Sequence, residues 1–575
     1  MLRLADGTLV LAATDLTNHL ACAHLTQQRL AIARGERSKP RPAADPHADL
    51  IRNRGEVHER EQLDRLSVEC GGHIDLSREV SPYTCDGLEV AALATAEAMR
   101  GGAPLIYQAQ FFDGRWQGRA DFLRRVPVAS TLGNHAYEVL DTKLARQVKP
   151  QVVHQLSLYN RLLATVQGFE PAFADLVLGD GSTVAIDLRR YAALHRHVVR
   201  QLERIVAEPA RPTYPEPVEH CAICALAAEC RARLIADDHL SLVAGARRDH
   251  REHLVEAGLP TVLSLAQAPQ TAAARPLSSE RFALLHQQAA LQVQSRISGS
   301  PTHRHLLPAG AAGYALLAAP SAGDVFFDLE GDPYVGDGGI EYLWGWWTAE
   351  SGYECVWAHD ATAEKAAFEQ FVDRMGELRV PYPDLHVFHY APHELSKLRS
   401  LSVHYATREE EVDELLRGEV LVDLYAVVRQ GMQVGEQSYS LKKLERHHGF
   451  RRLEKRVQEG GGSIVAYETW LETGDAELLE AIRAYNEERP RIRSGPHTRR
   501  LREGRGRRRD RHGHLARGRR PRARHALRAR PHRDLARPEP RRLTARRRPN
   551  GAGSDQVRRR RGGDCFVAKG VARAT

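Results

Sequence analysis

The chain has 575 residues, enough for two to four domains with cores of their own. It contains no apolar run near 18 residues and no signal-peptide pattern, so we expect a cytoplasmic protein without a membrane partner. The net charge of +9 is unevenly spread: residues 489–575 hold 30 Arg and one Lys against six acidic residues, and residues 1–488 hold 51 basic against 67 acidic residues. The basic balance therefore belongs to the last segment and says nothing about the partners of the rest.

Residues 1–235 are predicted to mix helices with a strand-rich middle. Apolar residues at helical spacing predict helices over 15–35, 51–66 and 151–166. Alternating apolar residues predict strands over 105–126, with a turn at Asp113-Gly114, and over 135–145.

Two predicted strands of this segment carry acidic residues. Asp121 lies in "GRADFL", and Asp141 and Lys143 lie two apart in "YEVLDTKLA", so these two share one face of a strand. Paired carboxylates can hold a divalent metal that activates water, and a Lys beside them can orient the nucleophile or stabilise the transition state. A solvated ion pair on a strand edge is the alternative interpretation of the D-x-K pattern alone.

Two neighbouring motifs favour the metal site over the solvated ion pair. "GEVHE" places His58 on an upstream helix, and "QLSLY" places Gln155 and Tyr159 one helical turn apart downstream. Taken in this order, the motifs resemble the RecB-like branch of the PD-(D/E)XK nucleases. The resemblance implies a restriction-endonuclease-like α/β domain that cuts DNA with Mg²⁺ or Mn²⁺. It further implies that the metal ligands are His58, Asp121 and Asp141, that the catalytic lysine is Lys143, and that Gln155 and Tyr159 form the helix motif near the DNA.

Four cysteines have metal-ligand spacing. Cys221, Cys224 and Cys230 fall within "HCAICALAAEC", and Cys22 lies far upstream in "HLACAH". Four thiolates suit either a tetrahedral zinc ion or a [4Fe–4S] cluster. One Cys before the nuclease core and three after it is the pattern of the resembled family, where it holds a [4Fe–4S] cluster that joins the two ends of the domain. Cys70, Cys85 and Cys355 have no partners at ligand spacing and are interpreted as ordinary buried thiols.

Residues 236–320 are predicted to form a helical connector with Ala/Pro/Gly-rich loops. Its stretch "LVEAGLPTVLSLAQ" has a helix–turn–helix-like pattern. That pattern fits either a hairpin that follows a DNA backbone or a hairpin that packs between two domains.

A second α/β unit is predicted over residues 321–488. Asp328 and Glu330 share one face of the apolar strand "DVFFDLEG", and carboxylates this close repel each other unless a cation lies between them. With Glu394 in "HYAPHELSKL", they resemble the ribonuclease-H-like, DEDD-type exonucleases, which implies a metal site at Asp328, Glu330 and Glu394. The late helix motif of that family begins at Tyr485, but Arg489 stands where its last Asp belongs, and an Arg cannot bind a cation. We therefore expect an incomplete, inactive exonuclease domain.

The Arg-rich segment 489–575 admits three interpretations: a disordered basic arm for nucleic acid, a linker, or translation out of frame. Its excess of Arg over Lys and its start inside a motif favour the frameshift, since an evolved basic tail usually mixes the two. The resemblance places a helicase after this helix, yet the chain has no G-x4-G-K-[ST] motif.

Together these features predict a metal-dependent DNA nuclease for repair, recombination or processing, truncated before its helicase. It would be an exonuclease acting on single-stranded or free-ended DNA, with a separate helicase as a further partner. The alternative is a catalytically inactive scaffold that binds DNA or associates with a helicase.

Overall fold

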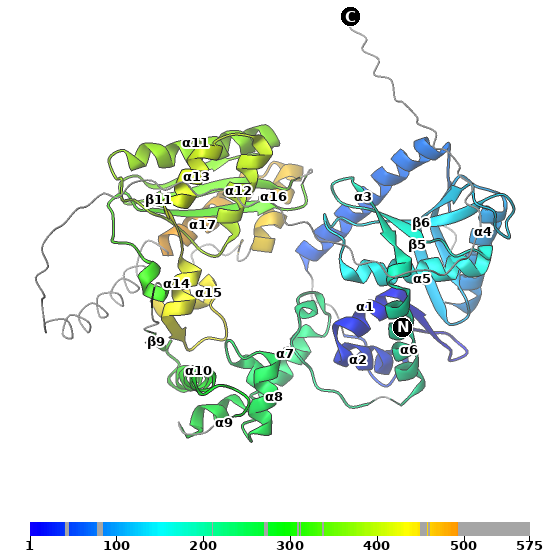
Figure 1. Cartoon of the computed structure of the whole chain (residues 1–575), viewed down its shortest axis with the longest axis horizontal. Coiled ribbons are helices and arrows are strands. Elements are labelled where there is room, and N and C mark those ends of the chain that lie inside the picture. Colours follow the sequence, from blue (N-terminus) through cyan, green and yellow to red (C-terminus); the bar gives the residue numbers. More distant parts are fainter. Residues whose placement is uncertain are drawn as a thin grey trace, which may run out of the picture. The chain divides into compact units, whose positions relative to one another are not determined.

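A computed structural model gives the structure of the chain (Figure 1). It describes residues 1–40, 45–77, 84–209, 211–269, 274–306, 310, 312–335, 338–448, 457 and 460–492. The segment predicted to be a disordered, frameshifted tail lies outside the described residues from position 493 onward.

The first α/β unit is built on one mixed sheet. Its strands run in the order β1-β2-β5-β6-β7-β8, with β4 paired to β5 and β3 paired to β4. β4 and β5 form the predicted hairpin, and Gly114 adopts the left-handed conformation that the turn requires (φ +87°). The strands are β1 (Leu2–Arg3), β2 (Leu9–Ala12), β3 (Ile74–Asp75), β4 (Leu105–Phe112), β5 (Trp116–Val126), β6 (Ala136–Thr142), β7 (Phe173–Val177) and β8 (Thr183–Asp187).

Helices cover both faces of this sheet. The single helix predicted for 15–35 is two helices, because the extended backbone of Cys22 (φ −157°) separates α1 from α2. On one face, α3 packs Leu66 against Phe122 and Leu140. The helices of this unit are α1 (Ala13–Ala21), α2 (Ala23–Ala33), α3 (Pro46–Cys70), α4 (Cys85–Arg100), α5 (Pro150–Gln167), α6 (Ala192–Ala207) and α7 (Ala227–Ala236).

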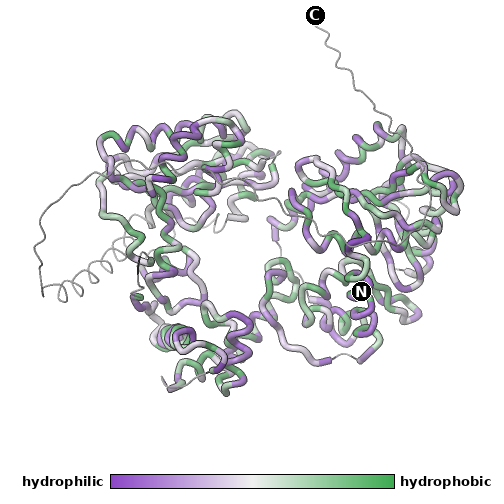
Figure 2. Tube along the Cα trace, viewed as in Figure 1, coloured by the Kyte–Doolittle hydropathy of each residue, from purple (hydrophilic) through white to green (hydrophobic). Residues whose placement is uncertain are grey.

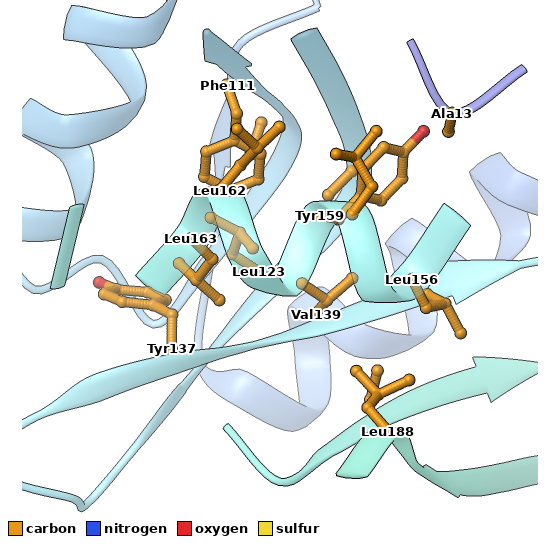
Figure 3. Close-up of a cluster of buried hydrophobic side chains, with 14 of the residues drawn as sticks. Ala13, Phe111, Leu123, Tyr137, Val139, Leu156, Tyr159, Leu162, Leu163 and Leu188 are labelled. Carbon is orange, nitrogen blue, oxygen red and sulfur yellow. The ribbon is translucent and has the colours of Figure 1, made fainter. Parts of the chain in front are cut away.

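Helix α5 covers the other face and connects the parallel strands β6 and β7. It begins with Pro150, whose fixed φ suits the first turn of a helix, and ends at Gly168 in the left-handed conformation (φ +62°). Its residues Leu156, Tyr159, Leu162 and Leu163 lie with Leu123 and Val139 from the sheet (Figure 3). This packing determines which face of the sheet Gln155 and the Tyr159 hydroxyl of α5 can reach.

The helical connector is a packed unit of its own. Leu254 and Leu265, from the two short helices of the helix–turn–helix-like stretch, are buried together with Phe282 of α10. This burial favours the packing interpretation of that stretch. The helices are α8 (Arg248–Glu256), α9 (Val262–Gln267) and α10 (Ser279–Ser298).

The connector also joins the unit that follows it. Strand β9 (His303–His305) pairs antiparallel with β15 (Met432–Val434), and Tyr314 is buried with Val427 and Val428. The boundary predicted at residue 320 therefore divides segments that pack on each other.

The second α/β unit has a five-stranded sheet in the order β12-β11-β10-β13-β14. The first three strands in sequence are antiparallel, and β13 and β14 run parallel to β10. The strands are β10 (Val325–Asp332), β11 (Ile340–Thr348), β12 (Gly352–Trp357), β13 (Val387–His389) and β14 (Leu421–Asp423). The helices are α11 (Ala361–Arg379), α12 (His393–Tyr405), α13 (Glu409–Arg417), α14 (Leu424–Gly431), α15 (Leu441–Leu444), α16 (Gly460–Thr473) and α17 (Ala476–Ile492).

The two faces of this sheet carry different helices. Phe327 and Leu329 of β10 pack on the side of α11, whereas Tyr342 of β11 packs with Ile482 and Tyr485 of α17. Figure 1 shows α11 and α13 on one side of the strands around β11 and α17 on the other. Helix α17 continues to Ile492, past the domain boundary predicted at residue 488, and its Ala481, Ile482 and Tyr485 are buried in the core beside the sheet.

Hydropathy varies over short distances along the described chain. Hydrophilic and hydrophobic segments alternate along the tube in Figure 2. No helix in the described part of the chain is long and apolar enough to cross a membrane.

Candidate active site

Asp121 and Asp141 lie opposite each other on neighbouring strands. The register that pairs Phe122 with Leu140 also brings the adjacent Asp121 of β5 and Asp141 of β6 together. The Asp121 carboxylate accepts hydrogen bonds from the backbone N–H of Thr142 at 2.8 Å and from its hydroxyl at 3.0 Å. Burial, followed by repulsion from Asp121, raises the pKa of the completely buried Asp141 well above its ordinary value.

Lys143 follows directly after β6 and completes this group, which we call the carboxylate cluster (Asp121, Asp141, Lys143). Its backbone N–H donates to the carbonyl of Val177 at 2.9 Å, so the segment still follows β7. Its ammonium donates to Asp141 Oδ2 and, at 2.9 Å, to the carbonyl of Thr142. Burial alone would lower the pKa of Lys143, but attraction from Asp141 and Asp121 raises it, so the side chain stays charged.

Gln155 and Tyr159 of α5 extend the cluster by hydrogen bonds. The Gln155 amide donates to Asp141 Oδ1 at 3.3 Å and to the Tyr159 hydroxyl oxygen at 3.2 Å. The Tyr159 ring packs against the backbone of Gly118, where an added Cβ would lie 2.6 Å from the ring. The structure therefore brings together the Asp121, Asp141, Lys143, Gln155 and Tyr159 side chains that the sequence singled out.

Helix α3 contributes Glu59 to this site. Burial, followed by repulsion from Asp121, raises the pKa of Glu59, and the amide of Gln108 donates a hydrogen bond to it. His58 on the same helix is buried, burial lowers its pKa, and its Nε2 is a buried nitrogen without a hydrogen-bond partner among the described residues. Its role as a metal ligand stays a prediction. Sequence reasoning missed Glu59, although the same motif contains it.

The residue types of the site fit a hard divalent cation. Asp121, Asp141 and Glu59 present carboxylate oxygens, the ligands that Mg²⁺ and Mn²⁺ prefer, and a cation would relieve the repulsion among them. Within the described ranges, no three His, Cys, Asp or Glu side chains are gathered closely enough to form a metal site by themselves. The donor set therefore suits such an ion by its chemistry, without forming a closed shell of ligands.

The four predicted cysteine ligands line one cavity of about 340 Å³, which we call the thiol cavity (Cys22, Cys221, Cys224, Cys230). Cys22 lies at the break between α1 and α2, and its sulfur accepts a hydrogen bond from the Leu25 N–H at 3.4 Å. Burial and the three neighbouring thiols raise the pKa of Cys230 to about 11. The sulfur atoms are thus close enough to affect one another, although Cys22 lies about 200 positions before the other three.

The remaining cysteines lie apart from this cavity. Cys70 and Cys355 are half-buried free thiols elsewhere in the structure. The side chain of Cys85 and the whole of Cys565 lie outside the described residues.

The predicted residues of the second unit are buried around β10. Asp328 and Glu330 are 2% and 4% exposed, and the amide of Asn486 on α17 donates to Asp328 Oδ2 at 3.1 Å. Glu394 lies in the first turn of α12, where His389 Nδ1 is 3.8 Å from its carboxylate. Tyr485 is buried in the core that α17 forms with the sheet, and the side chain of Arg489 lies outside the described residues.

Comparisons with known proteins identify the second unit alone. Residues 325–490 match the family model described as the RNase_H superfamily. No curated protein and no solved structure matches the chain. The match spans the five-stranded sheet and extends into α17, the helix that carries Tyr485 and Asn486. The chain therefore carries an RNase H-like domain of nuclease-type fold over residues 325–490.

Proposed function

We propose that the chain is a metal-dependent DNA nuclease of the RecB-like type, acting on single-stranded or free-ended DNA. The carboxylate cluster is the observation that carries this proposal, because it places the buried carboxylate of Asp141 opposite the half-buried carboxylate of Asp121, beside one charged lysine. A solvated ion pair would leave Asp141 in water, whereas its side chain is completely buried. The RNase H-like domain supports the nuclease class for the chain as a whole.

Each side chain of the site has a role in this proposal. Asp121 and Asp141, with His58 or Glu59 from α3, would hold Mg²⁺ or Mn²⁺, which would supply Lewis-acid activation of water and neutralise charge on the phosphate. Lys143 is held in place by Asp141 and presents its ammonium to the scissile phosphate, where it stabilises charge that develops in the transition state. Gln155 fixes the second oxygen of Asp141, and Tyr159 fixes Gln155.

The second unit contributes no hydrolysis in this proposal. Asp328, Glu330 and Glu394 supply carboxylates, but position 489 is Arg where a fourth carboxylate would complete the set. We assign cleavage to the carboxylate cluster and nucleic-acid binding to the RNase H-like domain.

A nuclease assay tests the assignment. Purified protein with Mn²⁺ should shorten labelled single-stranded DNA, and Lys143→Ala should reduce the rate by about 100-fold or more, since it removes one preorganised cation from the transition state. Lys149→Ala is the matched control, because Lys149 is exposed at the start of α5 and belongs to no part of the site. A shifted band without products in the wild-type protein would favour the catalytically inactive DNA-binding scaffold.

For the thiol cavity we propose a structural [4Fe–4S] cluster. The four thiols line one cavity, and four thiolates suit such a cluster, whereas zinc sites usually come as two C-x2-C pairs, which this chain lacks. The cluster would tie Cys22 to the three cysteines that follow the nuclease core, which removes freedom from the unfolded chain.

Iron analysis of anaerobically purified protein tests the cluster. Cys22→Ser should lower both the iron content and the melting temperature, whereas Cys70→Ser should change neither, since Cys70 lies outside the thiol cavity. Full iron content and unchanged melting in Cys22→Ser would contradict the proposal, and zinc in place of iron would assign the site to that metal.

A further inference from the structure

A cavity of about 370 Å³ is lined by α10, by Arg231 of α7 and by residues 435–446. Four of its lining residues are cationic: Arg231, Arg296, Lys443 and Arg446. Among the described residues that line it, Glu436 is the one carboxylate, and Arg446 is 3.1 Å from that carboxylate. We call this space the basic cavity.

Among the residues that the structure describes, two of these cations have no carboxylate partner. Lys443 forms no ion pair there, and Arg231 donates to the neutral side chain of Gln437 at 2.6 Å. Arg296 is paired with Asp238 at 2.5 Å, but half of its side chain remains exposed. The basic cavity therefore carries positive charge that its own surroundings do not cancel.

A second cavity, of about 330 Å³, lies along another part of α10 and shares Gln437 with the first. Its lining holds Arg281 and Arg429 together with Tyr425 and Tyr439, and none of the described lining residues is a carboxylate. The guanidinium of Arg429 lies 5.8 Å from the centre of the Tyr425 ring. We call this space the tyrosine cavity.

Buried amide side chains hold the walls of both cavities in place. Gln288 of α10 donates to the carbonyl of Val434 at 2.7 Å, and Gln292 donates to the carbonyl of Leu242 at 2.7 Å. Gln433 reaches back to the carbonyl of Leu284 on α10 at 2.9 Å. Because these groups are buried and bonded, the cavities are formed before any ligand arrives.

We propose that the two cavities form a binding site for single-stranded nucleic acid. Cations from the two cavities suit successive phosphates, and tyrosine rings beside guanidinium groups suit stacked bases. Concave spaces of this size admit nucleotides of a single strand, whereas a double helix is too wide to enter them. The positive charge of these cavities also contrasts with the net negative charge of residues 1–488. The site lies outside the carboxylate cluster, so the inference does not rest on the proposed hydrolysis.

Binding of a labelled oligothymidylate to the full chain, with a chelator present to prevent cleavage, tests this site. Lys443→Ala with Arg281→Ala should weaken binding and make the slope of log K against log salt shallower by about 0.7 for each lost phosphate contact. Lys442→Ala is the matched control, since Lys442 is adjacent, exposed and outside both cavities. Lys149→Ala should also bind as the wild type does, since Lys149 is exposed and lies outside both cavities. Because the chelator removes cleavage from this measurement, failure of the binding site and failure of the proposed nuclease are distinguished.

Cross-linking with an oligonucleotide that contains bromodeoxyuridine locates the strand directly. Peptides that contain Tyr425 or Tyr439 should carry the cross-link. Several results would overturn the proposal: cross-links confined to residues 493–575, an unchanged salt slope in the double variant, an equal loss in Lys442→Ala, or displacement by duplex DNA or polyglutamate as effective as by a single strand.

Discussion

Tyr159 packs against the backbone of Gly118 and positions Gln155, which in turn holds Asp141. Gly118→Ala would place a methyl group 2.6 Å from the Tyr159 ring, so the ring must move. We expect a loss of about 1–3 kcal/mol in the free energy of unfolding, as for other overpacked sites. We also expect a slower nuclease rate, because the hydrogen-bond chain to Asp141 is displaced.

Gly55→Ala provides the control for this substitution. Position 55 lies within α3, and an added Cβ there would meet no atom within 4 Å. Ala at a helical position without a clash stabilises by about 0.5–1 kcal/mol relative to Gly, so its melting temperature should rise and its nuclease rate should stay unchanged. Equal melting temperatures of the Gly118→Ala and wild-type proteins would contradict the packing described for Tyr159.

His195 predicts how the stability of the first unit depends on pH. Its ring is 4% exposed, and burial, followed by the nearby His154, lowers its pKa from 6.5 to about 4. Between these values the unfolded chain binds a proton that the folded chain refuses, so stability falls as the pH decreases from 6.5 toward 4. The loss from this one group amounts to about 3 kcal/mol.

Thermal unfolding at several pH values checks this prediction. His195→Leu should flatten the fall in melting temperature below pH 6.5, whereas His197→Leu should follow the wild type, because His197 is exposed. A wild-type slope in His195→Leu would show that other groups set the acid sensitivity.

Sequence reasoning found those residues of the site whose spacing is local. Asp141 and Lys143 on one strand, and Gln155 and Tyr159 one helical turn apart, follow from the periods of strands and helices. The position of Glu59 depends on how α3 packs on the sheet, where Leu66 is buried with Phe122. Such a contact joins segments far apart in sequence, and no local pattern encodes it.

Helix α17 is held to the second sheet by Asn486. Besides the Asp328 contact, its Oδ1 accepts a hydrogen bond from the Tyr353 hydroxyl at 2.8 Å, and the side chain is completely buried. Asn486→Ala leaves buried groups without these bonds, so we expect the RNase H-like domain to lose about 2 kcal/mol of stability. Denaturant unfolding of the full chain measures this loss.

Glu480→Ala on the same helix is the matched control. Its side chain is 62% exposed and pairs only with Arg483, so its removal should cost about 0.5 kcal/mol or less. If Asn486→Ala unfolds at the same denaturant concentration as Glu480→Ala, α17 is not fixed to the sheet in the way described.

At the scale of elements, the alternation and the helical spacing of apolar residues predicted most helices and strands. The elements that were not predicted depend on contacts between segments far apart in the sequence. The extended conformation of Cys22, which divides α1 from α2, interrupts a stretch whose apolar pattern reads as one helix. Strand β9 pairs with β15, about 130 positions later in the sequence. No local pattern predicts this pairing, so the domain boundary expected at residue 320 separates two segments that pack together. The change from acidic to basic composition at Arg489 predicted that the domain ends at residue 488, but helix α17 continues to Ile492.

At the scale of the whole molecule, two α/β units occupy one chain, and each buries acidic side chains in its sheet. Asp141 in the first unit and Asp328 in the second are both nearly or completely buried. The units differ in their cations: Lys143 belongs to the carboxylate cluster, whereas the second unit has Arg489 where a carboxylate is expected. Cleavage should therefore depend on the first unit alone.

Cleavage of labelled single-stranded DNA by three proteins in Mn²⁺ tests this account most directly. The wild type and a variant with Asp328→Asn and Glu330→Gln should give the same products at similar rates, and Lys143→Ala should give none above the buffer control. Loss of cleavage in the Asp328/Glu330 variant together with undiminished cleavage by Lys143→Ala would contradict the account and move the active site to the RNase H-like domain.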